Sequence, residues 1–136
     1  MHKDIIIDNS EEKKLIEDLN NRNDVKAERI KRLLDLPDLS RKEGSPLHAI
    51  VDKVLKTPDF IDFDVIKIPE IISTGILFDL FGFSEDHPAR SESDTYYVDQ
   101  NYVLRTHDTV FWHYYLNDPI IKEKIIHHKS FGTFCY

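Results

Sequence analysis

The sequence predicts an α+β domain preceded by an N-terminal helical arm. Apolar residues recur at helical spacing within residues 10–34 and again within 46–55, which predicts amphipathic helices. A β-branched and aromatic run at 63–68, together with a strand–turn–strand pattern over 95–104, predicts a small sheet. The chain has 136 residues, 40% of them apolar, so it can bury a core and is not expected to be disordered.

The first 45 residues predict two short helices and a connector. Ser10 and Asp24 are placed as N-caps, and each following helix carries a narrow apolar stripe. Two alternatives stay open for this pair: a helical hairpin packed on its own domain, or an arm that reaches a partner. Residues 35–46 contain two prolines and a glycine and predict the connector. The predicted division therefore separates residues 1–45 from residues 46–136.

The helix that begins at Pro46 has the strongest signals in the chain. Ser45 is a suitable N-cap, and proline is favoured at the first helical position. Apolar residues then fall at i, i+3, i+4, i+7 and i+8 from Leu47. The strand at 63–68 is closed by Pro69, which has no N–H to extend a ladder.

In the second half of the chain, some segments predict a helix or strand and others predict no defined element. Residues 71–83 are apolar and interrupted by glycine, and we expect only a buried connection there. Residues 108–116 predict a buried aromatic helix, and Asp118 with Pro119 predicts the start of another. The last six residues, 131–136, predict an apolar strand with unpaired edge groups. We therefore expect a sheet cut at its last strand, and self-association of the chain.

Composition excludes several classes of protein. The net charge of −7 argues against a broad nucleic-acid surface, and any RNA contact is expected in the less acidic first third. The N-terminus has no apolar run long enough for a signal peptide or a membrane span. A single cysteine, Cys135, excludes an intramolecular disulfide. These features predict a cytoplasmic protein that does not enter a membrane.

The sequence also argues against metal and thiol chemistry. His107 and Asp108 form the dipeptide of metal-dependent HD phosphohydrolases, but the chain lacks the further ligands at suitable spacing. The adjacent His127 and His128 would point apart on a helix. The four glycines are scattered and form no phosphate loop, and Cys135 has no predicted activating neighbour. No metal site and no catalytic residue is predicted.

Two motifs point to a known family. Residues 87–97 read His-Pro-Ala-Arg-Ser-Glu-Ser-Asp-Thr-Tyr-Tyr, and residues 104–109 read Leu-Arg-Thr-His-Asp-Thr after a hairpin. In this order and spacing they resemble the α subunit of phenylalanyl-tRNA synthetase, a class II aminoacyl-tRNA synthetase. The resemblance covers about residues 44–136, from motif 1 to the start of motif 2. It implies an antiparallel sheet flanked by helices, incomplete in this chain, with motif 1 forming subunit contacts.

The resemblance also implies half of an amino-acid site. His107 and Thr109 would hydrogen-bond near the amino group of the substrate, as an imidazole and a hydroxyl can. Asp108 and Ser93 depart from the usual residues of the family and are weaker candidates. We also expect Arg90 to pair with Asp94. The residues expected to order the motifs are His87, Arg90, Asp94, Arg105 and Pro69.

The implied activity is ATP-dependent attachment of phenylalanine to tRNA. ATP and Mg²⁺ would serve the complete enzyme, whose motif 2 and motif 3 arginines lie downstream of these residues in the family. The isolated chain is therefore expected to need no cofactor and to be inactive. Expected partners are phenylalanine, tRNA, and either a synthetase β subunit or a second copy of the chain. The alternative is a non-catalytic relative that acts as a subunit-interaction module.

Overall fold

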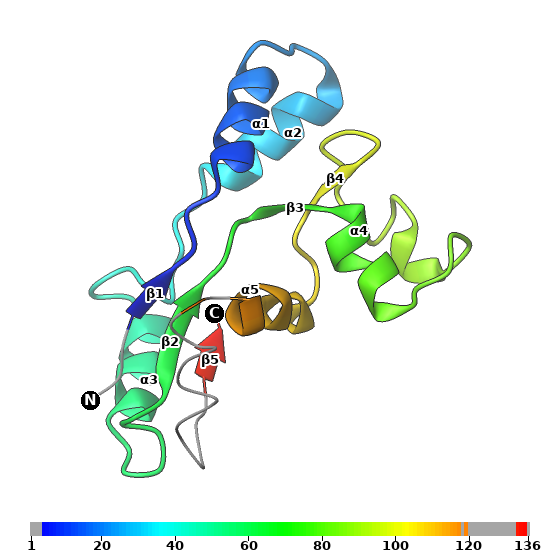
Figure 1. Cartoon of the computed structure of the whole chain (residues 1–136). Helices are drawn as coiled ribbons and strands as arrows, with labels where there is room; N and C mark the ends of the chain where they lie inside the picture. Colours follow the sequence, from blue (N-terminus) through cyan, green and yellow to red (C-terminus); the bar gives the residue numbers. More distant parts are fainter. Residues whose placement is uncertain (1–3, 118, 120–132, 136) are drawn as a thin grey trace. The chain divides into compact units, whose positions relative to one another are not determined.

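The computed structural model describes residues 4–117, 119 and 133–135 of the chain (Figure 1). The chain divides into two compact units whose segments alternate along the sequence. The first unit is drawn from Met1–Ile7, Pro37–Ile68 and Phe111–Tyr136, and the second from Asp8–Leu36 and Pro69–Val110. Each unit is described by itself below. The division predicted between residues 45 and 46 stays a prediction.

The first unit contains a three-stranded parallel sheet. Its order is β1 (Asp4–Ile6), β2 (Asp64–Lys67) and β5 (Thr133–Cys135), with β2 in the centre (Figure 1). Ile5 is opposite Ile66, and Val65 is opposite Phe134. The expectation of an antiparallel sheet is therefore wrong for these three strands. Parallel pairing needs long crossover connections, and the segments between these strands are long enough to provide them.

Helix α3 (Pro46–Leu55) confirms the clearest sequence prediction. The Ser45 hydroxyl accepts a hydrogen bond from the Leu47 amide at 3.2 Å, and Pro46 occupies the first turn. Leu55 is buried, whereas Leu47 and Ile50 are 45% and 59% exposed. Half of the predicted apolar face is thus left uncovered within the described residues.

The aromatic helix of the first unit begins later than predicted. Residues Asp108–Val110 form a 3-10 turn, η3, which belongs to the second unit, and helix α5 follows at Phe111–Asn117. Tyr115 is completely buried and its hydroxyl lies 3.4 Å from the buried carboxylate of Asp64 in β2. Trp112 is 42% exposed, so the helix is buried on one side only.

The second unit joins a helical pair to an antiparallel strand pair. Strand β3 (Ile71–Ser73) pairs with β4 (Tyr102–Leu104), with Ile72 opposite Val103. Residues 95–98, predicted as a strand, contribute only an isolated bridge between Tyr97 and Val103. The remaining elements are helix α1 (Ser10–Asn20), helix α2 (Val25–Leu34), helix α4 (Thr74–Leu77), and the 3-10 turns η1 (Asp79–Phe81) and η2 (Pro88–Arg90).

The helical pair packs on the strand pair. Leu19, Ala27 and Ile30 form one buried cluster with Ile71 and Val98. Burial of this apolar surface favours the packed state over a free arm. Of the two alternatives left open by the sequence, the structure therefore confirms the hairpin packed on its own domain.

Side-chain hydrogen bonds begin each helix and fasten the pair to β3. Asp24 caps α2 as predicted, but the cap of α1 is Asn9 rather than Ser10. Glu12 of α1 accepts hydrogen bonds from the amides of Glu70 and Ile71 at 2.7 and 3.0 Å. These bonds satisfy backbone groups at the start of β3 that its pairing with β4 does not use.

Two sequence predictions concern residues with little or no description. The helix predicted from Asp118 and Pro119 falls almost entirely outside the described residues, as do positions 131, 132 and 136 of the predicted terminal strand. The central part of that strand, β5, is confirmed. None of the helices in the described ranges combines the length and apolar character needed to cross a membrane.

Candidate functional site

The histidine motif, residues 87–97, begins with the short 3-10 turn η2, which has a side-chain cap. The Nδ1 atom of His87 accepts a hydrogen bond from the Ala89 amide at 3.1 Å, and Pro88 occupies the first position of η2. An Nδ1 acceptor in a neutral imidazole leaves the proton on Nε2. His87 thus caps η2 through an exposed side chain, and its ordering role in the motif stays a prediction.

Arg90 pairs with Asp79 rather than with the predicted Asp94. Its Nη1 atom donates to Asp79 Oδ1 at 2.7 Å and to the Phe83 carbonyl at 2.9 Å. Its guanidinium carbon lies 4.9 Å from the centre of the Phe78 ring, a cation–π contact. The expected Arg90–Asp94 spacing would suit a continuous helix, but η2 ends at Arg90 and the chain then turns.

Hydrogen bonds from the turn after η2 join the second half of the motif to its first half. The Thr95 hydroxyl donates to the Ala89 carbonyl at 2.7 Å, and the Tyr97 hydroxyl donates to the Arg90 carbonyl at 2.6 Å. Thr95 is buried. The Asp-Thr-Tyr-Tyr part of the motif therefore satisfies carbonyl groups of the His-Pro-Ala-Arg part.

The second motif leaves strand β4 through Arg105. The Arg105 amide donates to the Glu70 carbonyl at 2.8 Å, and its guanidinium lies 3.5 Å from the Glu70 carboxylate. Pro69 is buried immediately before Glu70. These contacts hold the end of β4 beside the start of β3, and they are consistent with the ordering role predicted for Arg105.

His107 lies in an aromatic cluster that joins the two motifs. Its imidazole stacks on the Phe83 ring, with centroids 5.4 Å apart and an interplanar angle of 29°. The edge of Phe78 approaches it at 6.2 Å, and Thr106 Oγ1 lies 3.0 Å from its Nδ1 atom. The Phe83 ring also meets His87 edge to face at 4.6 Å. Phe83 therefore contacts a histidine of each motif.

Phe83 stands in a segment, 81–83, that resembles the family just before the histidine motif, but the sequence did not mark it as a site residue because one phenylalanine among several carries no distinctive pattern. A usable signal was the preceding Gly82, which adopts the left-handed conformation with φ 76°. Glycine adopts this conformation without the steric cost that other residues carry. It ends η1 and directs Phe83 toward the motif that follows.

The other predicted binding residues lie at the surface. Thr109 and Asp108 belong to η3, directly after His107, and both side chains are exposed. Ser93 lies in the turn after η2, and its hydroxyl donates to Ser91 Oγ at 3.0 Å. The structure thus places His107 and Thr109 within one short segment, with the imidazole half-buried and the hydroxyl accessible.

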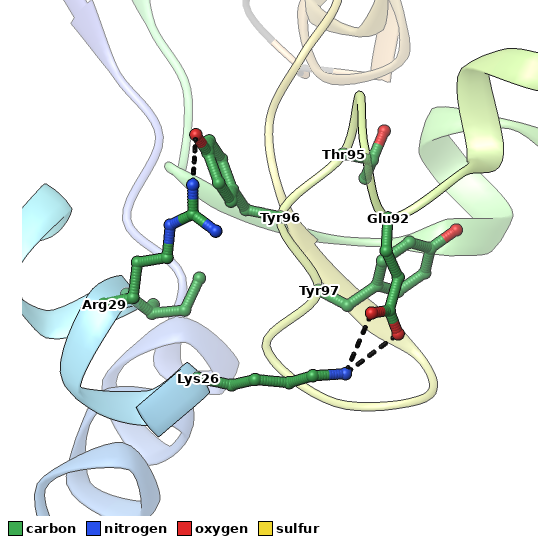
Figure 2. A pocket seen from close by; sticks show the side chains of 7 residues that line it. Lys26, Arg29, Glu92, Thr95, Tyr96 and Tyr97 are labelled. Carbon is green, nitrogen blue, oxygen red and sulfur yellow. Dashed lines mark hydrogen bonds and ion pairs between the residues drawn. The ribbon is translucent and has the colours of Figure 1, made fainter. Parts of the chain in front are cut away.

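A polar layer fixes helix α2 to the histidine motif. Figure 2 shows Lys26 and Arg29 directed toward the motif, where Lys26 contacts both carboxylate oxygens of Glu92 at 2.9 and 3.0 Å. Arg29 donates to the Tyr96 hydroxyl at 3.2 Å and lies 4.6 Å from the centre of the same ring. The pocket between these residues has about 60 Å³, room for a few water molecules.

Two pKa shifts concern the helical pair. The hydrogen bond from Arg22 and that from the Ala27 amide lower the pKa of the Asp24 carboxyl to about 2. On α1, Glu11 accepts a hydrogen bond from the Tyr102 hydroxyl, which raises the pKa of that phenol. The Asp24 contacts lie within the helical pair, whereas the Glu11–Tyr102 contact joins α1 to β4.

The two arginines of the motifs are already paired. Arg90 is engaged by Asp79 and Arg105 by Glu70. No group of three histidine, cysteine or acidic side chains within the described ranges is placed to hold a metal ion. The imidazole of His107, the hydroxyl of Thr109 and the ring of Phe83 can form hydrogen bonds and aromatic contacts.

Comparison with known proteins gives one consistent result. Residues 33–131 match the family model of the class II core domain of tRNA synthetases, type F. The chain is 36% identical over 100 residues to the phenylalanine–tRNA ligase α subunit of Thermotoga neapolitana, covering 72% of this chain and 30% of that protein. It is 36% identical over 78 residues to the corresponding subunit of Mycoplasmoides gallisepticum, covering 56% and 23%.

A mitochondrial relative gives a similar match. The mitochondrial phenylalanine–tRNA ligase of Saccharomyces cerevisiae is 38% identical over 73 residues, covering 51% of this chain and 15% of that protein. The chain thus spans less than a third of the length of each of these three relatives. The match includes both motifs that meet at Phe83 within the segment covered by the family model.

Proposed function

Because the chain belongs to the family of class II tRNA synthetase core domains, we propose that it forms the amino-acid side of a phenylalanine–tRNA ligase α subunit. The observation that carries this proposal is the convergence of the two motifs on Phe83, with His107 stacked on its ring. The names of the matched relatives, phenylalanine–tRNA ligases from three different organisms, support the same substrate.

His107 and Thr109 contact the substrate amino acid in this proposal. A neutral imidazole accepts a hydrogen bond from an ammonium group, and so does a hydroxyl oxygen. Both residues lie at one end of β4, in a segment that Arg105 ties to Glu70. Asp108 is exposed in the same turn and adds a carboxylate that would attract the ammonium.

The complete ligase would carry out the reaction in two steps. The phenylalanine carboxylate attacks the α-phosphorus of ATP and releases pyrophosphate, and the terminal ribose hydroxyl of tRNA then displaces AMP from the aminoacyl group. Stabilisation of the phosphoryl charge needs cations placed in advance. Since Arg90 and Arg105 are already paired with carboxylates, these cations would come from parts of the ligase beyond the segment matched here.

A second candidate function is supported by the surface of α3. Leu47, Ile50 and Val54 share one face of this helix and are 45%, 59% and 36% exposed. Apolar faces of this kind commonly mark protein–protein contacts. In the alternative, the chain is a non-catalytic module that binds a synthetase β subunit or a second copy of itself through this face.

Purification of the chain from its host tests both functions. If the chain belongs to a ligase, an assembly that contains it should exchange pyrophosphate with ATP only when phenylalanine is present. His107→Ala should raise the KM for phenylalanine by about 10- to 100-fold, the loss of one hydrogen bond to a charged group. His113→Ala, in α5 and outside the aromatic cluster, is the matched control. Normal exchange with His107→Ala would refute the substrate contact assigned to His107, whereas an assembly with no phenylalanine-dependent exchange would favour the interaction module.

A further inference from the structure

Phe83 is held from several directions before it meets His107. Its amide donates to the Phe78 carbonyl at 3.0 Å, and its own carbonyl accepts from Arg90 Nη1 at 2.9 Å. Its ring lies 5.9 Å from Phe78 and 4.6 Å from His87. A ring fixed at its backbone and on its edges presents a defined face to His107.

Stacking on this face restricts the imidazole in one respect only. The interplanar angle of 29° between Phe83 and His107 fixes the plane of the ring. A rotation of 180° about χ2 keeps that plane but exchanges the ring nitrogens with ring carbons. Phe83 therefore cannot select by itself which nitrogen faces a ligand.

Thr106 distinguishes the two flip states of the imidazole. Its Oγ1 atom lies 3.0 Å from Nδ1 of His107, so the flipped ring would lose this hydrogen bond. Nε2 is the other polar atom of the ring and stays available. Because the substrate ammonium only donates, Nε2 must carry the lone pair, and the proton must then reside on Nδ1 and be donated to Thr106 Oγ1.

We propose that Phe83 and Thr106 are positioning residues that hold the plane and the flip state of the His107 imidazole, so that Nε2 is presented to the ammonium group of the amino acid. Phe83 fixes the plane of the imidazole and Thr106 fixes its flip state. The identity of the ligand and the Nδ1–H tautomer rest on the proposed function, because the Thr106 hydroxyl can either donate or accept, whereas the ring plane and the flip state are properties of the chain alone.

Nuclear magnetic resonance of the 136-residue chain with ¹⁵N- and ¹³C-labelled histidine tests the geometry without a ligand. We expect the His107 ring signals to show an upfield ring-current shift. Thr106→Val keeps the β-branched shape, and loss of the hydroxyl should change the ¹⁵N shift of His107 Nδ1. Phe83→Leu should remove most of the ring-current shift, whereas Phe60→Leu, in the other unit, should leave it unchanged.

The outcomes separate the two proposals. A ¹⁵N shift of Nδ1 that Thr106→Val does not change, or a ring-current shift that survives Phe83→Leu, overturns the positioning roles. In the ligase assembly, both variants should raise the KM for phenylalanine by about tenfold, the effect of a ring held off its preferred rotamer, with a smaller change in kcat. Correct geometry with no phenylalanine-dependent activity would overturn the proposed function and leave the positioning roles intact.

Discussion

Arg90 donates to Asp79 across 2.7 Å, and this pair joins the turn η1 to the histidine motif. The arginine side chain is only 16% exposed, and it also contacts the Phe83 carbonyl and the Phe78 ring. One guanidinium therefore connects three groups that surround the candidate site. Its planar fork suits this task better than a lysine ammonium would.

Arg90→Lys should destabilise the chain although it keeps the charge. The lysine loses the fork geometry and the contact with Phe78, and we expect a loss of about 1–2 kcal/mol in the free energy of unfolding. Urea denaturation followed by circular dichroism measures it. Lys56→Arg, in the exposed pair with Asp52, is the control and should change little. Equal stability of both variants would contradict the role given to Arg90.

The helical pair should contribute to the stability of the second unit. Ile30 is buried at 2% exposure against Ile71 and Val98, and Ile30→Ala should cost about 2–4 kcal/mol. Val25→Ala, on the same helix at 85% exposure, should cost less than about 0.5 kcal/mol. Both values come from urea denaturation. Similar values for the two variants would mean that the pair behaves as a free arm.

The stability of the helical pair should also depend on pH. The folded-state pKa of Asp24 is about 2, below its ordinary value of 3.8, chiefly because Arg22 hydrogen-bonds its carboxylate. Its contribution is therefore complete above the unfolded pKa and is lost as the pH falls through about 2. Asp24→Asn should flatten the decline in stability between pH 4 and pH 2, measured by urea denaturation at each pH. Asp35→Asn, at the other end of α2, is the control; an equal slope for both would contradict the prediction.

Local signals predicted the helices better than the sheet. The Ser45 cap, Pro46 and the apolar spacing are all close in sequence to α3, and together they defined it. Strand β1 lies in a short run of isoleucines, which favour strands, but the run does not indicate a partner, and β2 lies about sixty residues away. Register and direction across such a distance depend on the crossover between the strands, which periodicity does not describe.

The sequence identified the two motifs of the candidate site but not the residues that connect them. His87, Arg90 and His107 were found because they stand in recognisable patterns, but the partner of Arg90 was assigned to Asp94. Phe83 and Asp79 precede the motif and become its neighbours only after Gly82 turns the chain. Contacts that depend on the left-handed backbone conformation of Gly82 cannot be predicted from composition or from the spacing of residues.

The exposed face of α3 should drive association of the chain. Leu47 and Ile50 are about half exposed on one side of the helix, and burial of such surface in a contact between copies is favourable. Sedimentation velocity should therefore show concentration-dependent association of the unaltered chain. The double variant Leu47→Glu/Ile50→Glu should shift the chain toward monomer, because charged side chains are costly to bury in a contact. Lys53→Glu, on the same helix, controls for added negative charge. A chain that stays monomeric at high concentration would remove association between copies and leave a different subunit as the partner of α3.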